Sequence, residues 1–117
     1  MNLTPLASQV ETYLDMLSVR QKLVASNVAN AATPGYKTRD IDFQFEFQSA
    51  LDPELRGTPV NVYEPDTLKA RNDGNNVSLD RESRLLSENS IRFNFATQLW
   101  KSQVRQVRAA IQEGRNG

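Results

Sequence analysis

Residues 4–37 of this 117-residue chain read TPLASQVETYLDMLSVRQKLVASNVANAATPGYK, and this stretch determines the fold. Apolar side chains recur along it at alternating steps of three and four, the spacing of a helix that packs along one narrow seam. Neither Gly nor Pro interrupts residues 6–33, and Thr4 followed by Pro5 can begin a helix. The seam positions are Leu3, Leu6, Val10, Tyr13, Leu17, Arg20, Val24, Asn27 and Ala31. We predict one long helix over residues 1–32.

Two of these seam positions, Arg20 and Asn27, are polar. Polar side chains in a seam lower stability but fix the register and the choice of partner. A straight helix drifts relative to a seven-residue repeat, so these side chains could instead face water. Both interpretations stay open on the spacing alone. The helix is expected to stop near Ala32, because the residue before Pro34 disfavours helical geometry.

The C-terminal segment, residues 79–117, repeats the helical pattern. Asp80 and Glu82 suit the positive end of a helix dipole, and Gly114 can end the helix. Its seam residues are Leu86, Phe93, Trp100, Val104 and Val107. We expect this seam to pack against that of the first helix.

The lengths of the two helices indicate an elongated molecule. At about 1.5 Å per residue they run roughly 40 and 50 Å, whereas a compact domain of this size is roughly 35 Å across. The fold class is therefore mainly α, an elongated, coiled-coil-like antiparallel pair of terminal helices. Residues 1–32 and 79–117 are expected to form one discontinuous helical domain, with residues 33–78 inserted. Narrow seams bury little area, so we expect loose termini in the isolated protein.

The insertion has a different character, with four of the five prolines. Residues 60–63 alternate like a short strand, and residues 67–71 are its expected hairpin partner. Apolar residues at every second position over 41–47 indicate a strand or an extended arm with one apolar side. Two turns are expected, a type II turn at Pro34-Gly35 and a second at Asp73, Gly74 and Asn75.

The composition argues against an enzyme. The chain has no Cys and no His, so thiol nucleophiles, His-based triads and the usual zinc ligands are excluded. Asp73-Gly74-Asn75 does not fit a calcium loop, because Lys69 and Arg71 would fall on ligand positions. We expect no catalytic residue, no metal, no cofactor and no small-molecule substrate.

The charges of the chain are balanced but unevenly distributed. Its 14 basic and 14 acidic residues cancel, which argues against nucleic-acid binding. Residues 1–80 sum to −4 (7 basic, 11 acidic) and residues 81–117 to +4 (7 basic, 3 acidic), so the two portions attract each other within one chain or between neighbours. No apolar run is long enough for membrane insertion.

Three motifs together resemble those of bacterial flagellar rod and hook proteins. The first is Arg20 with residues 25–37, ASNVANAATPGYK; the second is residues 39–43, RDIDF; the third is residues 73–82, DGNNVSLDRE. The short length is similar to that of the proximal rod members of this family. Departures such as Ala32, where Asp or Asn is usual, are small.

The resemblance implies a structural subunit of the flagellar basal-body rod, which serves motility and carries no cofactor. It implies export from the cytoplasm by the flagellar type III apparatus without a cleaved signal peptide, and assembly in the periplasmic rod. The implied partners are further copies of itself, rod proteins of the FlgC type and an adaptor of the FliE type. Asn27, Asn30 and the turn Thr33, Pro34, Gly35 and Tyr36 are expected to fix the junction where the chain leaves the helices.

A second function class fits the same pattern. A soluble helical adaptor, or a chaperone-like module that pairs with one partner helix, would also carry narrow apolar stripes. It differs from a rod subunit in forming a defined small complex rather than an open assembly.

Overall fold

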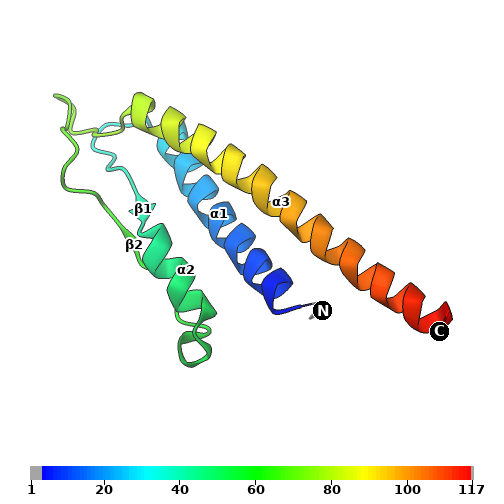
Figure 1. Cartoon of the computed structure of the whole chain (residues 1–117). Coiled ribbons are helices and arrows are strands. Elements are labelled where there is room, and N and C mark those ends of the chain that lie inside the picture. The colour runs from blue at the N-terminus through cyan, green and yellow to red at the C-terminus, as the bar shows by residue number, and fades with distance from the viewer. Residues whose placement is uncertain (1–3, 117) are drawn as a thin grey trace.

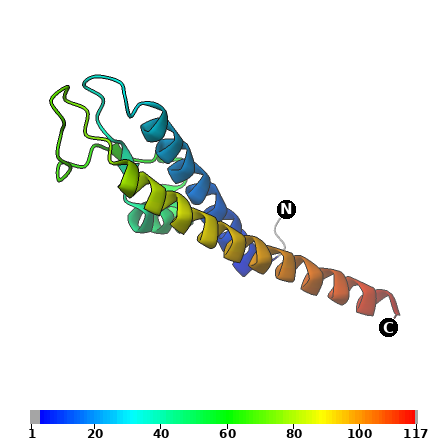
Figure 2. The same cartoon turned by 90° about the horizontal axis from the view of Figure 1, so that it is seen from above.

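The computed structural model describes residues 4–116. The molecule is an elongated helical hairpin with a smaller arm beside it (Figures 1 and 2), and it measures 71 × 30 × 17 Å along its principal axes. The elements in chain order are α1 (Pro5–Ala29), β1 (Asp40–Ile41), α2 (Phe43–Leu51), the short 3-10 helix η1 (Pro53–Leu55), β2 (Val62–Tyr63) and α3 (Leu79–Asn116). The predicted fold class is confirmed. The predicted seam position Leu3 lies outside the described residues.

Helix α1 begins and ends on polar side chains. The Thr4 hydroxyl accepts a hydrogen bond from the Ala7 N–H at 2.9 Å, as an N-cap does. At the other end, both the backbone N–H and the side-chain amide of Asn30 donate to the Ser26 carbonyl. This local competition ends the helix at Ala29, three residues before the predicted end.

Helix α3 continues through Gly114, so the predicted stop at this residue is wrong. Glycine permits the left-handed conformation that ends many helices, but it does not impose it. Gly35, Gly57 and Gly74 do adopt positive φ. Gly35 and Gly74 lie in the two predicted turns, and the Tyr36 N–H donates to the Thr33 carbonyl at 3.2 Å across the first.

The prediction of an extended segment over 41–47 is wrong beyond Ile41, because α2 begins at Phe43. Asp42 caps this helix by accepting from the Phe45 N–H at 3.2 Å. Phe43 and Phe47, four residues apart, both pack edge-on against Tyr13 of α1, with ring centres 5.2 and 5.3 Å away. A helical turn brings both rings to the same side, and Phe45, which a strand would place beside them, is 60% exposed.

Strand β2 pairs antiparallel with β1, with Ile41 opposite Val62, so the predicted pairing of residues 60–63 with 67–71 is wrong. Ile41 is buried in the main apolar cluster together with Met16, Leu17 and Phe43. Burial of this side chain holds the strand pair beside α1 and thereby positions the whole arm.

The interface between α1 and α3 uses a line of α3 residues that recur every seven positions: Glu82, Asn89, Ala96 and Gln103. Three of them are polar, and each bonds to a polar side chain of α1. The pairs are Asn27–Glu82 at 3.1 Å, Gln21–Asn89 at 3.1 Å and Thr4–Gln103 at 2.9 Å. The predicted seam lies four residues further along α3, so Leu86 and Phe93 are half-exposed and do not fill this interface.

Candidate functional site

The buried side chain of Asn27 connects both helices to the loop between them. Its amide nitrogen donates to the Arg39 carbonyl at 2.9 Å and to Glu82 Oε1 at 3.1 Å. Its amide oxygen accepts from the Arg39 N–H and the Tyr36 hydroxyl, both at 3.0 Å. Asn27 is 1% exposed, so the interpretation in which it faces water is wrong.

A cluster of charges lies beside Asn27. The Asp40 carboxylate accepts from Arg20 at 3.2 Å and from Arg81, and Arg81 also contacts Glu82 at 2.9 Å. Arg20 is thus a partner of the arm that carries Asp40 rather than of α3. Burial raises the pKa of the Glu82 carboxyl above its usual value, against the opposing effects of Arg81 and of hydrogen bonds from Arg81 and Asn27.

The two turns meet each other at the end of the hairpin. The Asn75 amide donates to the carbonyls of Asn30 and Thr33, both at 2.9 Å, and the Gly35 N–H donates to the Asp73 carbonyl at 2.8 Å. A Cβ added to Gly74 would lie 3.4 Å from the Gly35 backbone. The positive φ of both residues favours glycine at each position.

Several contacts of this junction are not evident from the sequence pattern. Asp40 and Arg81 belong to the motifs of residues 39–43 and 73–82, but the sequence pattern does not indicate that these two side chains pair. Arg71 donates to the carbonyls of Val77 and Ala31. The backbone N–H of Thr38 donates to the Asn76 amide oxygen at 2.6 Å. Only the proximity of these residues to the turn motifs could have indicated a role.

The expected seam residues are divided among different surroundings. Val10, Leu17 and Val24 are buried on α1, whereas Tyr13 packs on α2 instead of α3. Leu6, Leu86 and Phe93 are 42–50% exposed. Trp100, Val104 and Val107 are partly exposed on the distal half of α3. The α3 seam therefore forms an apolar ridge along the molecule, to one side of α1.

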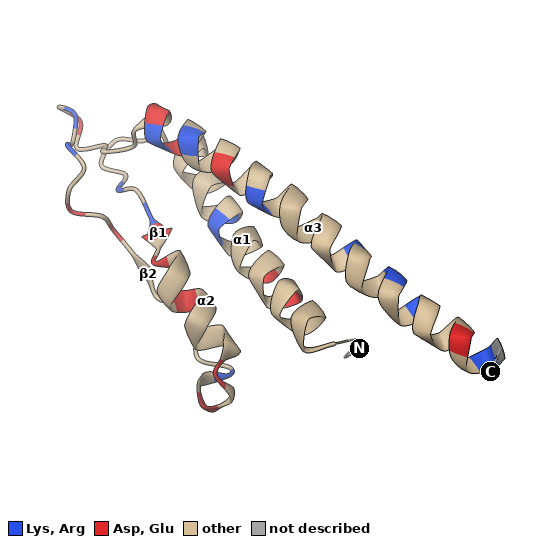
Figure 3. Cartoon of the chain, viewed as in Figure 1, with Lys and Arg blue, Asp and Glu red and all other residues tan. Residues whose placement is uncertain are grey.

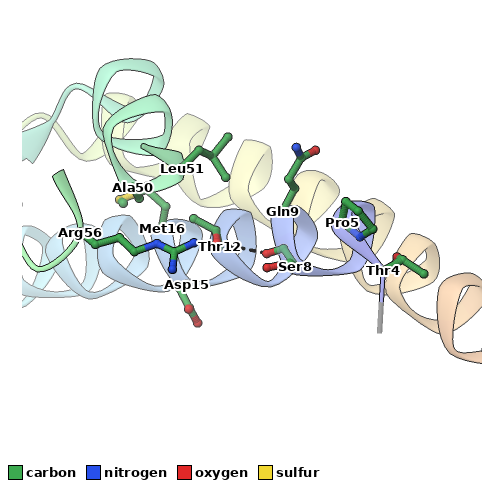
Figure 4. Close-up of a pocket in the computed structure, with 10 residues that line it drawn as sticks. All are labelled: Thr4, Pro5, Ser8, Gln9, Thr12, Asp15, Met16, Ala50, Leu51 and Arg56. Atoms are coloured by element: carbon green, nitrogen blue, oxygen red, sulfur yellow. Dashed lines mark hydrogen bonds between the residues drawn. The ribbon is translucent and has the colours of Figure 1, made fainter. Parts of the chain in front are cut away.

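Open grooves flank α1. One, of about 510 Å³, is apolar and lies between α1, α2 and α3, lined by residues that include Tyr13, Phe47, Ile91, Phe95 and Leu99. Another, of about 810 Å³, runs from the start of α1 to the end of α2, with Thr4, Ser8, Thr12 and Arg56 on its walls (Figure 4). In the part of the chain that the structure describes, no cluster of acidic side chains could hold a metal ion, and no helix could span a membrane.

A long helical hairpin with a polar junction and an exposed apolar ridge is typical of a protein that associates through its helices. Comparison with known proteins identifies its class. Residues 14–37, which contain Arg20, Asn27 and the first turn, match the model of the family described as flagella basal body rod protein. The chain is 30% identical to the flagellar basal body rod protein FlgB of Proteus mirabilis over 86% of its own length and 89% of that protein. It is 28% identical to FlgB of Escherichia coli (86% and 88%) and 29% identical to FlgB of Borrelia hermsii (85% and 90%). The chain belongs to the FlgB family of flagellar basal body rod proteins.

Proposed function

We propose that this protein is a structural subunit of the proximal rod, which polymerises through its terminal helices into part of the torque-transmitting shaft. The supporting observation is the apolar ridge on α3, because Leu86 and Phe93 stay half-exposed in the single chain. Such a ridge is stabilised only when another helix covers it. The terminal helices act as one discontinuous unit, and residues 33–78 are an insertion that contacts neighbouring subunits.

The proposed partners are other copies of this chain, FlgC-type rod proteins and a FliE-type adaptor. Export would run through the flagellar type III apparatus without signal-peptide cleavage, into the periplasmic rod. A chain threaded through a narrow channel must be unfolded, and the absence of Cys fits such a path, since no disulfide can form beforehand. In this function the protein acts by assembly, with no catalytic step.

The test is Trp100→Ala. Trp100 lies on the ridge and is only partly buried, so its removal should spare the fold but reduce incorporation into basal bodies. We expect secretion to stay near the parent level, while basal-body content and motility fall. Val28→Ala, which removes an exposed apolar side chain of α1 outside both the ridge and the insertion, is the control. Normal motility and rod assembly in Trp100→Ala would contradict the proposal.

The apolar groove between α1, α2 and α3 favours one alternative, an adaptor that binds a single partner helix. Light scattering against concentration separates the two functions. An adaptor reaches one closed complex size, whereas a rod subunit associates without a closed size or requires its rod neighbours.

A further inference from the structure

Helix α3 is longer than the helix that it packs against. Its last bond to α1 joins Gln103 to Thr4, at the start of α1, and α3 continues to Asn116. Residues 104–116 therefore project past α1 by about 20 Å. Figures 1 and 2 show that α3 extends beyond the start of α1. Along this end, Trp100, Val104, Val107 and Ile111 follow steps of four and three, the spacing of a helix-packing seam.

The projecting end and the first half of α1 carry opposite charges. Lys101, Arg105 and Arg108 lie on α3, and the sequence between Glu88 and Glu113 contains no acidic residue. The first half of α1 has Glu11 and Asp15 and no base before Arg20. Figure 3 shows these acidic and basic positions along α1 and α3. The five side chains of Glu11, Asp15, Lys101, Arg105 and Arg108 are exposed, and none of them joins an ion pair among residues 4–116.

The register of the hairpin prevents these charges from meeting within one chain. Interpolation between the pairs Thr4–Gln103 and Gln21–Asn89 places Glu11 level with about residue 97 of α3 and Asp15 level with about residue 94. Those positions are Thr97 and Asn94, which are uncharged. Arg105 and Lys101 lie seven to eight residues further, about 12 Å along the helix.

We propose that the distal part of α3, from Trp100 into the projecting end, packs antiparallel against the first half of α1 of a second copy. In this contact Arg105 faces Glu11 and Lys101 faces Asp15, since both pairs are spaced by four residues. Because α1 and α3 are antiparallel within each chain, the two copies run in the same direction, displaced by about 12 Å along the long axis. The proposal rests on the proposed function and specifies which surfaces meet.

The displacement has a geometric consequence. A contact between two different surfaces, offset along the axis, cannot be returned by the same neighbour. Each copy therefore receives one projecting end and offers another, and repetition gives an open assembly. Burial of the ridge supplies the affinity, while the exposed ion pairs select the register and weaken with salt.

The test uses the absence of Cys. The gene is placed in a flagellated bacterium without its own copy, Glu11→Cys and Arg105→Cys are co-expressed, and isolated basal bodies are mildly oxidised. We expect a disulfide-linked dimer of about twice the 13.2 kDa chain, and none with either variant alone. Glu11→Cys with Arg84→Cys, on the proximal part of α3, is the matched negative control. Thr4→Cys/Gln103→Cys in one chain is the positive control for oxidation.

The outcomes separate the two proposals. If the wild-type protein is absent from basal bodies, the proposed function is wrong. If both variants are incorporated without forming the dimer, or if Arg105→Cys is captured only by a different rod protein, this contact is wrong and the function stands. A second measurement uses charge: Arg105→Glu should lower incorporation roughly fivefold, and Glu11→Lys should restore it in the double variant. Failure of restoration contradicts the pairing.

Discussion

The Asn27 side chain makes the pair of backbone hydrogen bonds that a neighbouring strand would make. Its amide pairs with both the N–H and the carbonyl of Arg39, as a neighbouring strand would, while it also binds Glu82. These partners lie on the loop and on α3, so a single residue of α1 fixes the position of both. The seam spacing identified Asn27 from the sequence, but its partners could not be found there, because they lie 12 and 55 residues away.

Asn27→Ala should destabilise the protein by about 3 kcal/mol, since several buried polar groups would lose their partners at once. Urea unfolding followed by circular dichroism measures this change. Asn94→Ala, an exposed asparagine on α3, is the matched control and should shift the free energy of unfolding by no more than about 0.5 kcal/mol. Equal effects in the two variants would contradict the role of Asn27.

Glu82 should make stability depend on pH. Its pKa in the folded protein is raised by burial, so the folded state favours the protonated carboxyl. The contribution of this group to stability is therefore greatest below its unfolded pKa of 4.5 and falls as the pH rises through the folded pKa.

Glu82→Gln removes this titration and should raise the melting temperature at pH 7. Parent and variant should converge below pH 4.5. Thermal unfolding at a series of pH values measures the difference. Glu88→Gln, at a more exposed glutamate of α3, controls for loss of charge. A variant that melts lower than the parent at pH 7 would refute this account.

At the scale of elements, helix α2 was not predicted, because the apolar residues of this segment fit both the two-residue period of a strand and the four-residue spacing of a helix. Ile41, Phe43, Phe45 and Phe47 alternate as in a strand, but Phe43 and Phe47 also form an i, i+4 pair. Packing of these two rings on Tyr13 favours the helix over the strand. A tertiary contact of this kind cannot be predicted from the local sequence pattern.

Asp42→Ala should weaken α2 by about 1 kcal/mol, because the Phe45 N–H loses its acceptor. Hydrogen exchange of the amides of residues 45–49 should accelerate accordingly, with little change in α3. Asp42→Asn retains a capping side chain and should exchange like the parent. Equal acceleration in both variants would show that charge, not capping, stabilises the helix.

The two long helices were predictable because their seven-residue repeats are strong and uninterrupted. The α3 face that packs on α1 was not, because Glu82, Asn89 and Gln103 are polar and the hydrophobic pattern points four residues away. The hydrophobic pattern therefore predicts the α3 ridge that remains exposed, but not the polar α3 residues that are buried against α1.

At the scale of the whole molecule, order should decline along α3. Side chains of α3 from Glu82 to Gln103 bond to α1 and its N-cap, whereas the residues after Gln103 continue past the start of α1. In the dilute protein, amides of residues 104–113 should exchange much faster than those of residues 85–96. Hydrogen exchange followed by NMR measures this gradient, and uniform protection along α3 would contradict it.

The polar pairs between α1 and α3 also determine how the hairpin responds to shear. Asn27–Glu82, Gln21–Asn89 and Thr4–Gln103 are spread along nearly the whole of α1. Purely apolar faces could slide by one heptad, about 10 Å, and find new partners. Here such a slip would separate all three pairs at once, and it would bring Ala96 opposite Gln21 or Thr4, which would leave that polar side chain without its partner. The two helices should therefore resist sliding along their axes, and under sufficient force they should separate in one cooperative step rather than slide gradually.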